Sequence, residues 1–529
     1  MMKFRISSFF LQSPRSLASL KAQLQKGGTL KSFTVRFLIV LSSINSLFRF
    51  PVLKDLLMTA QGLLAGHVAE IELIDSLSGS KDTEILNPNL KTLPTNPLVD
   101  VLIIGSGPGA AVAAEIELGR GFQNILVVER GDVPKTANAL HHSLTHVIQD
   151  FNQAGQELVV AQGFPLYAQA NVVGGGSEVN SGLYHALPEQ YVKDYSKAFK
   201  VSEAAWLDSE KFIFNKLKPI KMNVFPEHSL LARGAMATNL SYGNIPRWRT
   251  YFDDGNFVHR GMNEIFWNKA SENSQISLVG NLEVLKISIK KSDHLEVSCR
   301  NTLTGEKSVI KAKRVHLAAG AISTPVLLAR SRIIRWRDTK FSWHPMVRVV
   351  AATKKIDLGA GDIDPFQAWT EDKKLKFGAA VSTAPLLSVA LGRPVSLREA
   401  SELRSYYVSF SSSGKGGLIP FLRLPWYKFS KLDRKLARDG VERLINLISA
   451  GGGEIVNPGK VSSKKYSTVH IFGTLPINGS IFVPGTNQLK ADKRIRVSDA
   501  SILPFGPGVN PQGVVMTAVK VANLGIPSD

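Results

Sequence analysis

The feature that most constrains the fold of this chain is a glycine-rich turn at residues 105–110, which joins an apolar run to an alanine-rich segment. Residues 99–104 are apolar and predict a buried strand, and residues 110–118 predict a helix. A second apolar run, 125–128, ends at Glu129. Strand, turn, helix and strand within about 30 residues form a β-α-β unit. The sequence therefore predicts the α/β class, α+β overall, with a Rossmann-like domain.

Each glycine or alanine of this turn has a physical role in holding a dinucleotide. Gly105 permits the tight turn, Gly107 lets backbone N–H groups approach a pyrophosphate, and Ala110 keeps the helix close to the strand. The helix N-terminus then holds the phosphate charge. Glu129 follows Gly105 by 24 positions, where a carboxylate can accept a hydrogen bond from the adenosine ribose. The turn predicts a bound nucleotide without distinguishing FAD from NAD.

Length and cysteine content narrow the class of protein. With 529 residues, the chain exceeds the size at which one core stops growing, so we expect two packed lobes plus an N-terminal extension. Cys299 is the only cysteine, which excludes an internal disulfide and a multi-cysteine metal site. Its alternating surroundings predict a small residue on a strand. No His, Asp and Glu cluster has ligand spacing, so no metal is expected.

Positive charge is concentrated at the N-terminus. The formal net charge is +21, and residues 1–54 carry nine Lys or Arg and no acidic residue. Zinc-finger spacing and aromatic RNA-binding signatures are missing, so nucleic acid is not expected as a partner. Peripheral contact with an anionic membrane surface explains the charge better.

An apolar segment, residues 37–48, lies within this basic region. Its 12 residues are too few to cross a bilayer, which requires roughly 20. Their helical spacing suits an interfacial helix, and a helix packed on the protein's own body or an organelle transit peptide are open alternatives. The segment lies too far from Met1 for a secretory signal. We therefore expect a cytoplasmic protein, with membrane contact or organelle targeting left open.

A second glycine cluster and several later motifs resemble one known family. Residues 171–180 contain three consecutive glycines, whose backbone N–H groups can closely meet a flat or charged ligand. The motifs at 315–325, 497–501 and 508–512 follow in order. Together with the first turn, they resemble the glucose–methanol–choline (GMC) family of flavin oxidoreductases, discontinuously over about residues 98–528. The triple glycine looks most like the cholesterol oxidase and long-chain alcohol oxidase branches.

The resemblance implies FAD as the cofactor. In the family, the triple-glycine segment and the element like residues 315–325 lie near the flavin, and the last signature closes over the isoalloxazine. A segment like residues 281–284 contacts adenine. The residues thereby expected to bind FAD are Gly105, Gly107, Pro108, Gly109, Ala110, Glu129, Arg130, Val173, Gly174, Gly175, Gly176, Ser177, Asn180, Val284, Ala319, Gly320, Asp499, Ala500, Asn510, Pro511 and Gln512.

His470 and Asn510 are the expected catalytic residues. Hydride transfer from an alcohol to flavin N5 requires removal of the hydroxyl proton, and an imidazole near neutral pKa suits that step. Asn510 would donate to or accept from the same oxygen and steady the developing alkoxide. By resemblance, the family uses a His–Asn or His–His pair at these positions. His344 and His185 are candidate pocket residues, but structural roles are expected for both.

The motifs also predict how the chain divides into domains. Residues 281–318 alternate like strands, whereas residues 336–464 have irregular periodicity and are assigned to a substrate-facing lobe built on a β-sheet. The expected division is a basic, partly amphipathic, helical N-terminal extension (1–95), a first segment of the FAD-binding domain (98–185), a substrate or cap insertion (186–260), a second segment of the FAD-binding domain (261–335), a discontinuous substrate-binding domain (336–464), and a FAD-binding and catalytic C-terminal segment (465–529).

The resemblance implies an alcohol oxidase or dehydrogenase acting on CH–OH groups of a small-molecule alcohol, with oxygen or a quinone or electron-transfer partner as acceptor. A lyase or photodecarboxylase on the same fold, or a non-catalytic membrane-associated flavoprotein, stays an alternative, and the His470–Asn510 pair favours the first. The sequence departs from the family in lacking a methionine at residues 475–479, and residues between Tyr184 and Met262 match no pattern. A sterol, long-chain alcohol, sugar or polyol therefore stays open as the substrate.

Overall fold

We describe the protein from a computed structural model of residues 1–529. The structure describes residues 65–66, 69–70 and 87–527, with gaps at 135–142, 156, 164, 249, 254–255, 260, 291, 354–362, 420–421, 423 and 457–460. The expected amphipathic segment at 37–48 lies outside the described residues. Within them, no helix combines the length and hydropathy that crossing a membrane requires.

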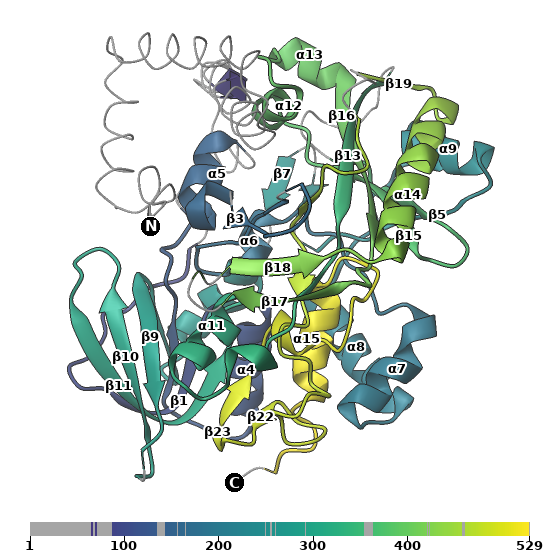
Figure 1. The fold of residues 1–529 in the computed structure, drawn as a ribbon. Coiled ribbons are helices and arrows are strands. Elements are labelled where there is room, and N and C mark those ends of the chain that lie inside the picture. Colours follow the sequence, from purple (N-terminus) through teal and green to yellow (C-terminus); the bar gives the residue numbers. More distant parts are fainter. Residues whose placement is uncertain are drawn as a thin grey trace, which may run out of the picture.

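The first lobe contains a sheet with a parallel centre (Figure 1). Its parallel strands lie in the order β23-β11-β1-β2-β8. Their bounds are β1 (Leu98–Ile104), β2 (Ile125–Val128), β8 (Ile276–Val279), β11 (Lys307–Leu317) and β23 (Asp492–Val497). Antiparallel strands extend it: β9 (Leu282–Ser288), β10 (Leu295–Asn301) and β22 (Gln488–Leu489). This is the order of a Rossmann-like sheet, as predicted.

The predicted β-α-β unit is confirmed. All four residues of β2 are buried, as a strand inside a parallel sheet requires. Helix α4 (Pro108–Gly119) begins directly after the glycine turn, with Pro108 in its first turn, where a missing N–H costs nothing. Cys299 is buried on β10, where the alternation of residues 295–299 predicted a strand.

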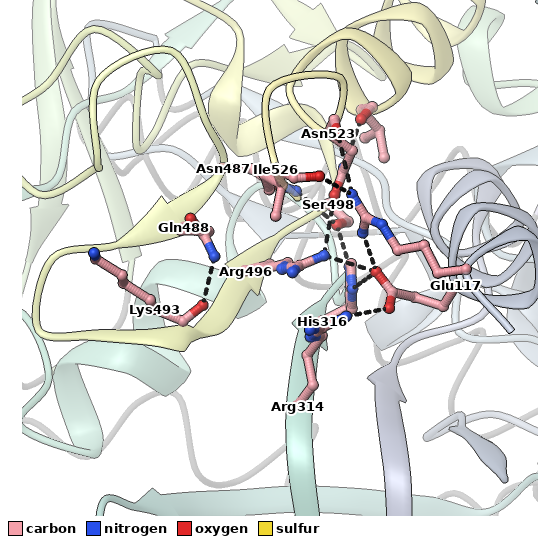
Figure 2. Close-up of polar contacts among 12 residues, drawn as sticks. Glu117, Arg314, His316, Asn487, Gln488, Lys493, Arg496, Ser498, Asn523 and Ile526 are labelled. Carbon is pink, nitrogen blue, oxygen red and sulfur yellow. Dashed lines mark hydrogen bonds and ion pairs between the residues drawn. The ribbon is translucent and has the colours of Figure 1, made fainter. Parts of the chain in front are cut away.

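A buried cluster of charges joins α4 to this sheet (Figure 2). The Glu117 carboxylate accepts from Arg314 at 2.6 Å, from Arg496 at 2.7 Å and from Arg120 at 2.5 Å, and lies 3.1 Å from His316 Nε2. Burial alone would raise the pKa of this carboxyl, but hydrogen bonding to His316 and the charges of His316, Arg496 and Arg314 hold it well below its usual range. We call these five residues the Glu117 cluster.

The second lobe contains a nine-stranded sheet assembled from distant segments. Its strands run β3-β4-β20-β13-β16-β15-β14-β5, and β19 also pairs with β13. Their bounds are β3 (Glu157–Leu158), β4 (Leu166–Tyr167), β5 (Ser241–Asn244), β13 (Met346–Thr353), β14 (Phe366–Trp369), β15 (Leu375–Ala380), β16 (Leu403–Phe410), β19 (Gly453–Ile455) and β20 (Ser467–Thr468). Helices α14 (Lys431–Ala450) and α9 (Leu230–Ala237) cover one face, at the upper right of Figure 1.

The two faces of this sheet differ in chemistry because side chains alternate along each strand. The register places Val347, Val408 and Phe377 on one face, where Gly440 of α14 packs closely against Val408. These side chains belong to a hydrophobic core shared with α14. The register also defines what we call the polar face, which consists of Met346, Arg348, Gln367, Trp369, Lys376, Gly378, Tyr407 and Ser409.

The remaining elements surround the two sheets. Helix α15 (Gln512–Val521) packs against α4 and α8. The other helices are α5 (Leu144–Asp150), α6 (Gly176–Val179), α7 (Glu189–Phe199), α8 (Glu203–Leu217), α10 (Asn268–Glu272), α11 (Ser323–Arg330), α12 (Ala384–Leu391) and α13 (Leu397–Glu402). Three small two-stranded sheets pair β6 (Thr250–Asp253) with β7 (Asn256–His259), β12 (Ser342–Trp343) with β21 (Ile471–Phe472), and β17 (Lys415–Ile419) with β18 (Leu424–Lys428).

Candidate active site

Two glycines of the first turn are required by close backbone contacts. Gly105 has φ +99°, and a Cβ there would lie 2.3 Å from the Ala318 carbonyl oxygen. A Cβ on Gly109 would lie 2.1 Å from the Ser498 carbonyl oxygen. The backbone of the turn therefore lies directly against the two later motifs, and only glycine fits at these two positions. The structure thus brings together three of the segments that the sequence predicted to bind FAD.

The triple-glycine loop packs against the same turn. Gly174 and Gly175 have φ of +92° and +61°, and a Cβ on Gly175 would lie 2.8 Å from the Gly107 Cα. The Ser106 hydroxyl accepts from the Gly174 N–H at 2.9 Å and donates to Glu129 at 2.8 Å. Two backbone segments rich in N–H groups therefore face one another, a geometry suited to a phosphate or a flat ring.

Glu129 stands at the carboxyl end of β2, where ligands bind in open parallel sheets. Its carboxylate accepts from the Ser106 N–H at 3.0 Å, and its carbonyl accepts from the N–H of Leu282 at 2.8 Å. Arg130 donates to the Asn171 side chain at 2.7 Å. The start of β9, which carries the half-buried Val284, therefore runs beside Glu129, as an adenosine site at this edge requires.

Asp499 joins the later motifs to one another. Its carboxylate accepts from the Gly320 N–H at 3.0 Å and from the Thr324 hydroxyl at 2.5 Å. Burial raises the pKa of Asp499, and these hydrogen bonds oppose the rise. The Ala500 carbonyl accepts from the Gly473 N–H at 2.9 Å. Through these bonds Ala319, which precedes Gly320, is held next to the segment that follows His470.

Some of the other expected FAD-binding residues hydrogen-bond within the triple-glycine loop, and one, Gln512, has a side-chain donor without a partner in the part of the chain that the structure describes. The Ser177 hydroxyl donates to the Gly174 carbonyl at 2.7 Å, and the Val173 carbonyl accepts from a protein amide, so both support the loop. A Cβ on Gly176 would meet nothing within 4 Å. Asn180 donates to Gln512 Oε1 at 2.7 Å, and the buried Nε2 of Gln512 has no hydrogen-bond partner among the described residues. Pro511 caps α15 at this point.

His470 is held by its backbone and leaves its ring free to react. Its N–H donates to Thr468 at 2.9 Å, and its carbonyl accepts from the His344 N–H at 3.1 Å. The buried Nδ1 has no hydrogen-bond partner within the portion of the chain that the structure describes. Burial, together with the charges of Lys376 and Arg348, lowers the pKa of His470 to about 3. The imidazole is therefore neutral at physiological pH and able to accept a proton.

A lysine that the sequence did not predict joins the two expected catalytic residues. Lys376 of β15 is buried, its Nζ donates to Asn510 Oδ1 at 2.6 Å, and burial lowers its pKa to about 7. An ammonium can only donate, so it must face the amide oxygen of Asn510, which leaves the Nδ2 donor to point elsewhere. The charge of the same ammonium also lowers the pKa of His470, so Lys376 acts on both expected catalytic residues.

His344 and His185, which were expected to have structural roles, belong to the same group of side chains. The rings of His344 and His470 lie 5.6 Å apart, nearly perpendicular to one another. Burial holds the pKa of both His344 and His185 well below the usual range, and the charges of Lys376 and His470 add to the effect. Among the described residues, no group of three or more His, Cys, Asp or Glu side chains could hold a metal ion.

Comparisons with known proteins agree with this arrangement. A family model described as GMC oxidoreductase matches residues 99–345. The chain is 24% identical over 484 residues to an uncharacterized GMC-type oxidoreductase of Sinorhizobium fredii, covering 81% of this chain and 94% of that protein. It is 20% identical over 496 residues to a long-chain-alcohol oxidase of Arabidopsis thaliana, covering 81% and 68%. The crystal structure of pyridoxine 4-oxidase from Mesorbium loti has a TM-score of 0.61 at 15% identity, covering 80% of this chain and 98% of that one, which shows a shared fold.

Proposed function

We propose that this chain is an FAD-dependent enzyme that oxidises a CH–OH group by hydride transfer to flavin N5. The premise is that the chain belongs, through residues 99–345, to the GMC oxidoreductase family. The observation that carries this proposal is the group around Lys376. It includes a neutral imidazole, His470, and a carboxamide, Asn510, which lies two residues before Gln512, the hydrogen-bond partner of Asn180 at the end of the triple-glycine segment.

The residues of the first lobe fit FAD. Gly105 and Gly109 keep the backbone too tight for any side chain, and Gly107 leaves the helix N-terminus open to a pyrophosphate. Glu129 is placed to accept from a ribose hydroxyl, and the partnerless Nε2 of Gln512 offers a donor near the start of α15. When bound, FAD supplies the acceptor of the hydride, while the protein supplies position and electrostatics.

His470 would take the hydroxyl proton. A base acts only in its unprotonated form, and the low pKa of His470 keeps it unprotonated at neutral pH. The same low pKa makes it a weak base, so it would accept the proton only as the hydride leaves and a carbonyl forms. The Nδ2 group of Asn510, turned away from Lys376, would donate to the same oxygen and stabilise its developing charge.

The test is anaerobic reduction of the bound flavin, screened across sterols, long-chain alcohols, sugars and polyols. The purified protein should be yellow, and at least one alcohol class should bleach it. His470→Ala should retain FAD and lower the reduction rate by roughly 10²- to 10⁴-fold, because a positioned base contributes about that much. Admission of air or of a quinone then identifies the electron acceptor.

His228→Ala is the matched control, since His228 is exposed on the surface and should leave the rate unchanged. A colourless, folded protein that cannot take up FAD would contradict the proposal. So would a His470→Ala variant that reduces at the native rate. A yellow protein that no alcohol bleaches would favour the lyase, photodecarboxylase or non-catalytic alternatives.

A further inference from the structure

The polar face of the second sheet carries positive charge without a matching negative charge. Arg348 of β13 and Lys376 of β15 are its only charged members. The four strands β13, β14, β15 and β16 contain no Asp or Glu. Among the described residues, no carboxylate pairs with either cation. Burying a cation costs free energy unless a negative charge pairs with it. This face of the sheet supplies no such counter-charge.

Arg348 is both exposed to solvent and surrounded by protein atoms. Its side chain is exposed, yet burial lowers its pKa. A small molecule can therefore reach the guanidinium. The neighbouring strands pack closely beside it. Tyr407 pairs with Arg348 in the register, its hydroxyl accepts from Gln367 at 3.2 Å, and a Cβ on Gly378 would lie 2.6 Å from that hydroxyl oxygen.

Lys376 lies on the same face of the sheet as Arg348, on β15, the strand on the other side of Tyr407. One of its three N–H donors is used by Asn510, and two remain. Lys376 and Arg348 lie on the same face of the sheet, on the two strands that flank β16, and the charges of both lower the pKa of His470. Like charges repel in the low dielectric of a protein interior, and a bound anion would relieve the repulsion.

We propose that the enzyme selects an alcohol that also carries a carboxylate, and that Lys376 and Arg348, on the same face of the sheet, bind that carboxylate. The inference rests on the proposed function and names its substrate class. Because Asn510 would hold the hydroxyl oxygen and also binds Lys376, the carboxylate lies a few bonds from the reacting carbon, as in a 2- or 3-hydroxy acid. In the reaction, the C–H hydride goes to flavin N5, the hydroxyl proton goes to His470, a C=O bond forms, and the carboxylate is unchanged.

The first experiment compares each hydroxy acid with its primary amide, which has similar size and no charge. Mandelate with mandelamide, 3-hydroxyhexanoate with its amide, and 4-(hydroxymethyl)benzoate with its amide place the carboxylate at increasing distances from the alcohol. In the wild-type holoenzyme, anaerobic flavin reduction should favour at least one acid by about tenfold or more in kcat/KM, as expected for charged hydrogen bonds. The third pair should show the smallest preference.

Variants show whether the two cations cause the preference. Lys376→Met and Arg348→Met should bring the acid-to-amide ratio close to one, whereas Lys376→Arg keeps the charge and should retain some of the preference. Lys374→Met is the matched control, because Lys374 lies on the same hairpin, is exposed, and pairs with Asp372 at 3.0 Å. A wild-type ratio of one or less for every pair would overturn the inference. So would Met variants that slow acid and amide equally.

A binding measurement without turnover separates this inference from the proposed function. Phenylacetate should raise the melting temperature of the holoenzyme and perturb its flavin spectrum, phenylacetamide should do so much less, and Lys376→Met should remove the difference. If neutral alcohols reduce the flavin but phenylacetate does not bind better than the amide, the carboxylate site is wrong and the proposed function stands. If phenylacetate binds as expected but no alcohol reduces the flavin, the proposed function is wrong and the anion site stands.

Discussion

Two groups of positively charged side chains in this protein, one in each lobe, differ in how they are paired. In the first lobe, the Glu117 cluster surrounds one carboxylate with arginines and a histidine, and every partner lies within hydrogen-bonding distance (Figure 2). In the second lobe, the amide oxygen of Asn510 bonds Lys376, and neither Lys376 nor Arg348 pairs with a carboxylate among the described residues. The first cluster is complete within the chain, whereas the second is complete only when something else binds.

This difference follows from where the two clusters lie. The Glu117 cluster lies at the C-terminal end of α4 and links α4 to β11 and β23, so its charges join elements that must not move. Lys376 and Arg348 lie on the polar face, next to His470. A buried ion network that is fully satisfied makes a structure rigid, and one that is only half satisfied is unstable on its own. We therefore expect the two clusters to respond in opposite ways when a charge is removed.

The largest effect should come from Glu117→Gln. This change leaves Arg314 and Arg496 buried without a counter-charge, and breaking a buried pair in this way typically costs about 3–5 kcal/mol. The free energy of unfolding, measured by urea denaturation, should fall by about that amount, or the protein should fail to fold.

Glu283→Gln is the control for that change. Glu283 pairs with Arg300 at 2.6 Å on the surface, where both side chains are partly exposed. Loss of such a pair should cost no more than about 1 kcal/mol. If the two variants lose similar stability, the Glu117 cluster is not the structural link that we describe.

Lys376→Met should have a smaller effect of the opposite sign. Removing a buried charged group in favour of an apolar side chain of similar volume can stabilise a protein by about 1–4 kcal/mol. Loss of the hydrogen bond to Asn510 offsets some of this gain. Lys374→Met should change the free energy of unfolding by less than about 0.5 kcal/mol. A Lys376→Met variant less stable than wild type would show that the lysine is a structural group.

The first lobe could be predicted from the sequence because its signals are local. The strand, turn and helix at 99–118 are contiguous, and the alternation within 281–318 appears as β9, β10 and β11. Gly105 was predicted to permit the tight turn, and the structure shows the backbone contact that requires a glycine there. Local patterns of this kind survive folding because neighbouring residues determine them.

The second lobe could not be predicted in the same way. Its sheet joins β3, β5 and β20 from distant regions of the chain, and no local pattern encodes such pairings. Lys376 follows a run of surface lysines and resembles another of them. Only the register with β16 shows that it points toward the polar face. His185 and His344 were assigned structural roles because nothing beside them in the sequence indicates that His470 is near.

The pH dependence of stability is the smallest effect and the most specific one. The folded pKa of Lys376, about 7, lies below its usual value of 10.5, so between these values the unfolded chain binds more protons than the folded one. The cost of burying Lys376 is therefore full below pH 7 and is relieved as pH rises toward 10.5. Glu117 has the opposite profile: its lowered pKa makes its stabilisation full above about 4.5, and acid removes it. Urea unfolding between pH 6 and 10 measures the difference in the free energy of unfolding between Lys376→Met and wild type. This difference should be largest near pH 6 and should shrink as pH rises. The corresponding difference between wild type and Glu117→Gln should stay constant over this range. If the difference between Lys376→Met and wild type did not change with pH, this lysine would stay charged in the folded protein and would already have a counter-charge.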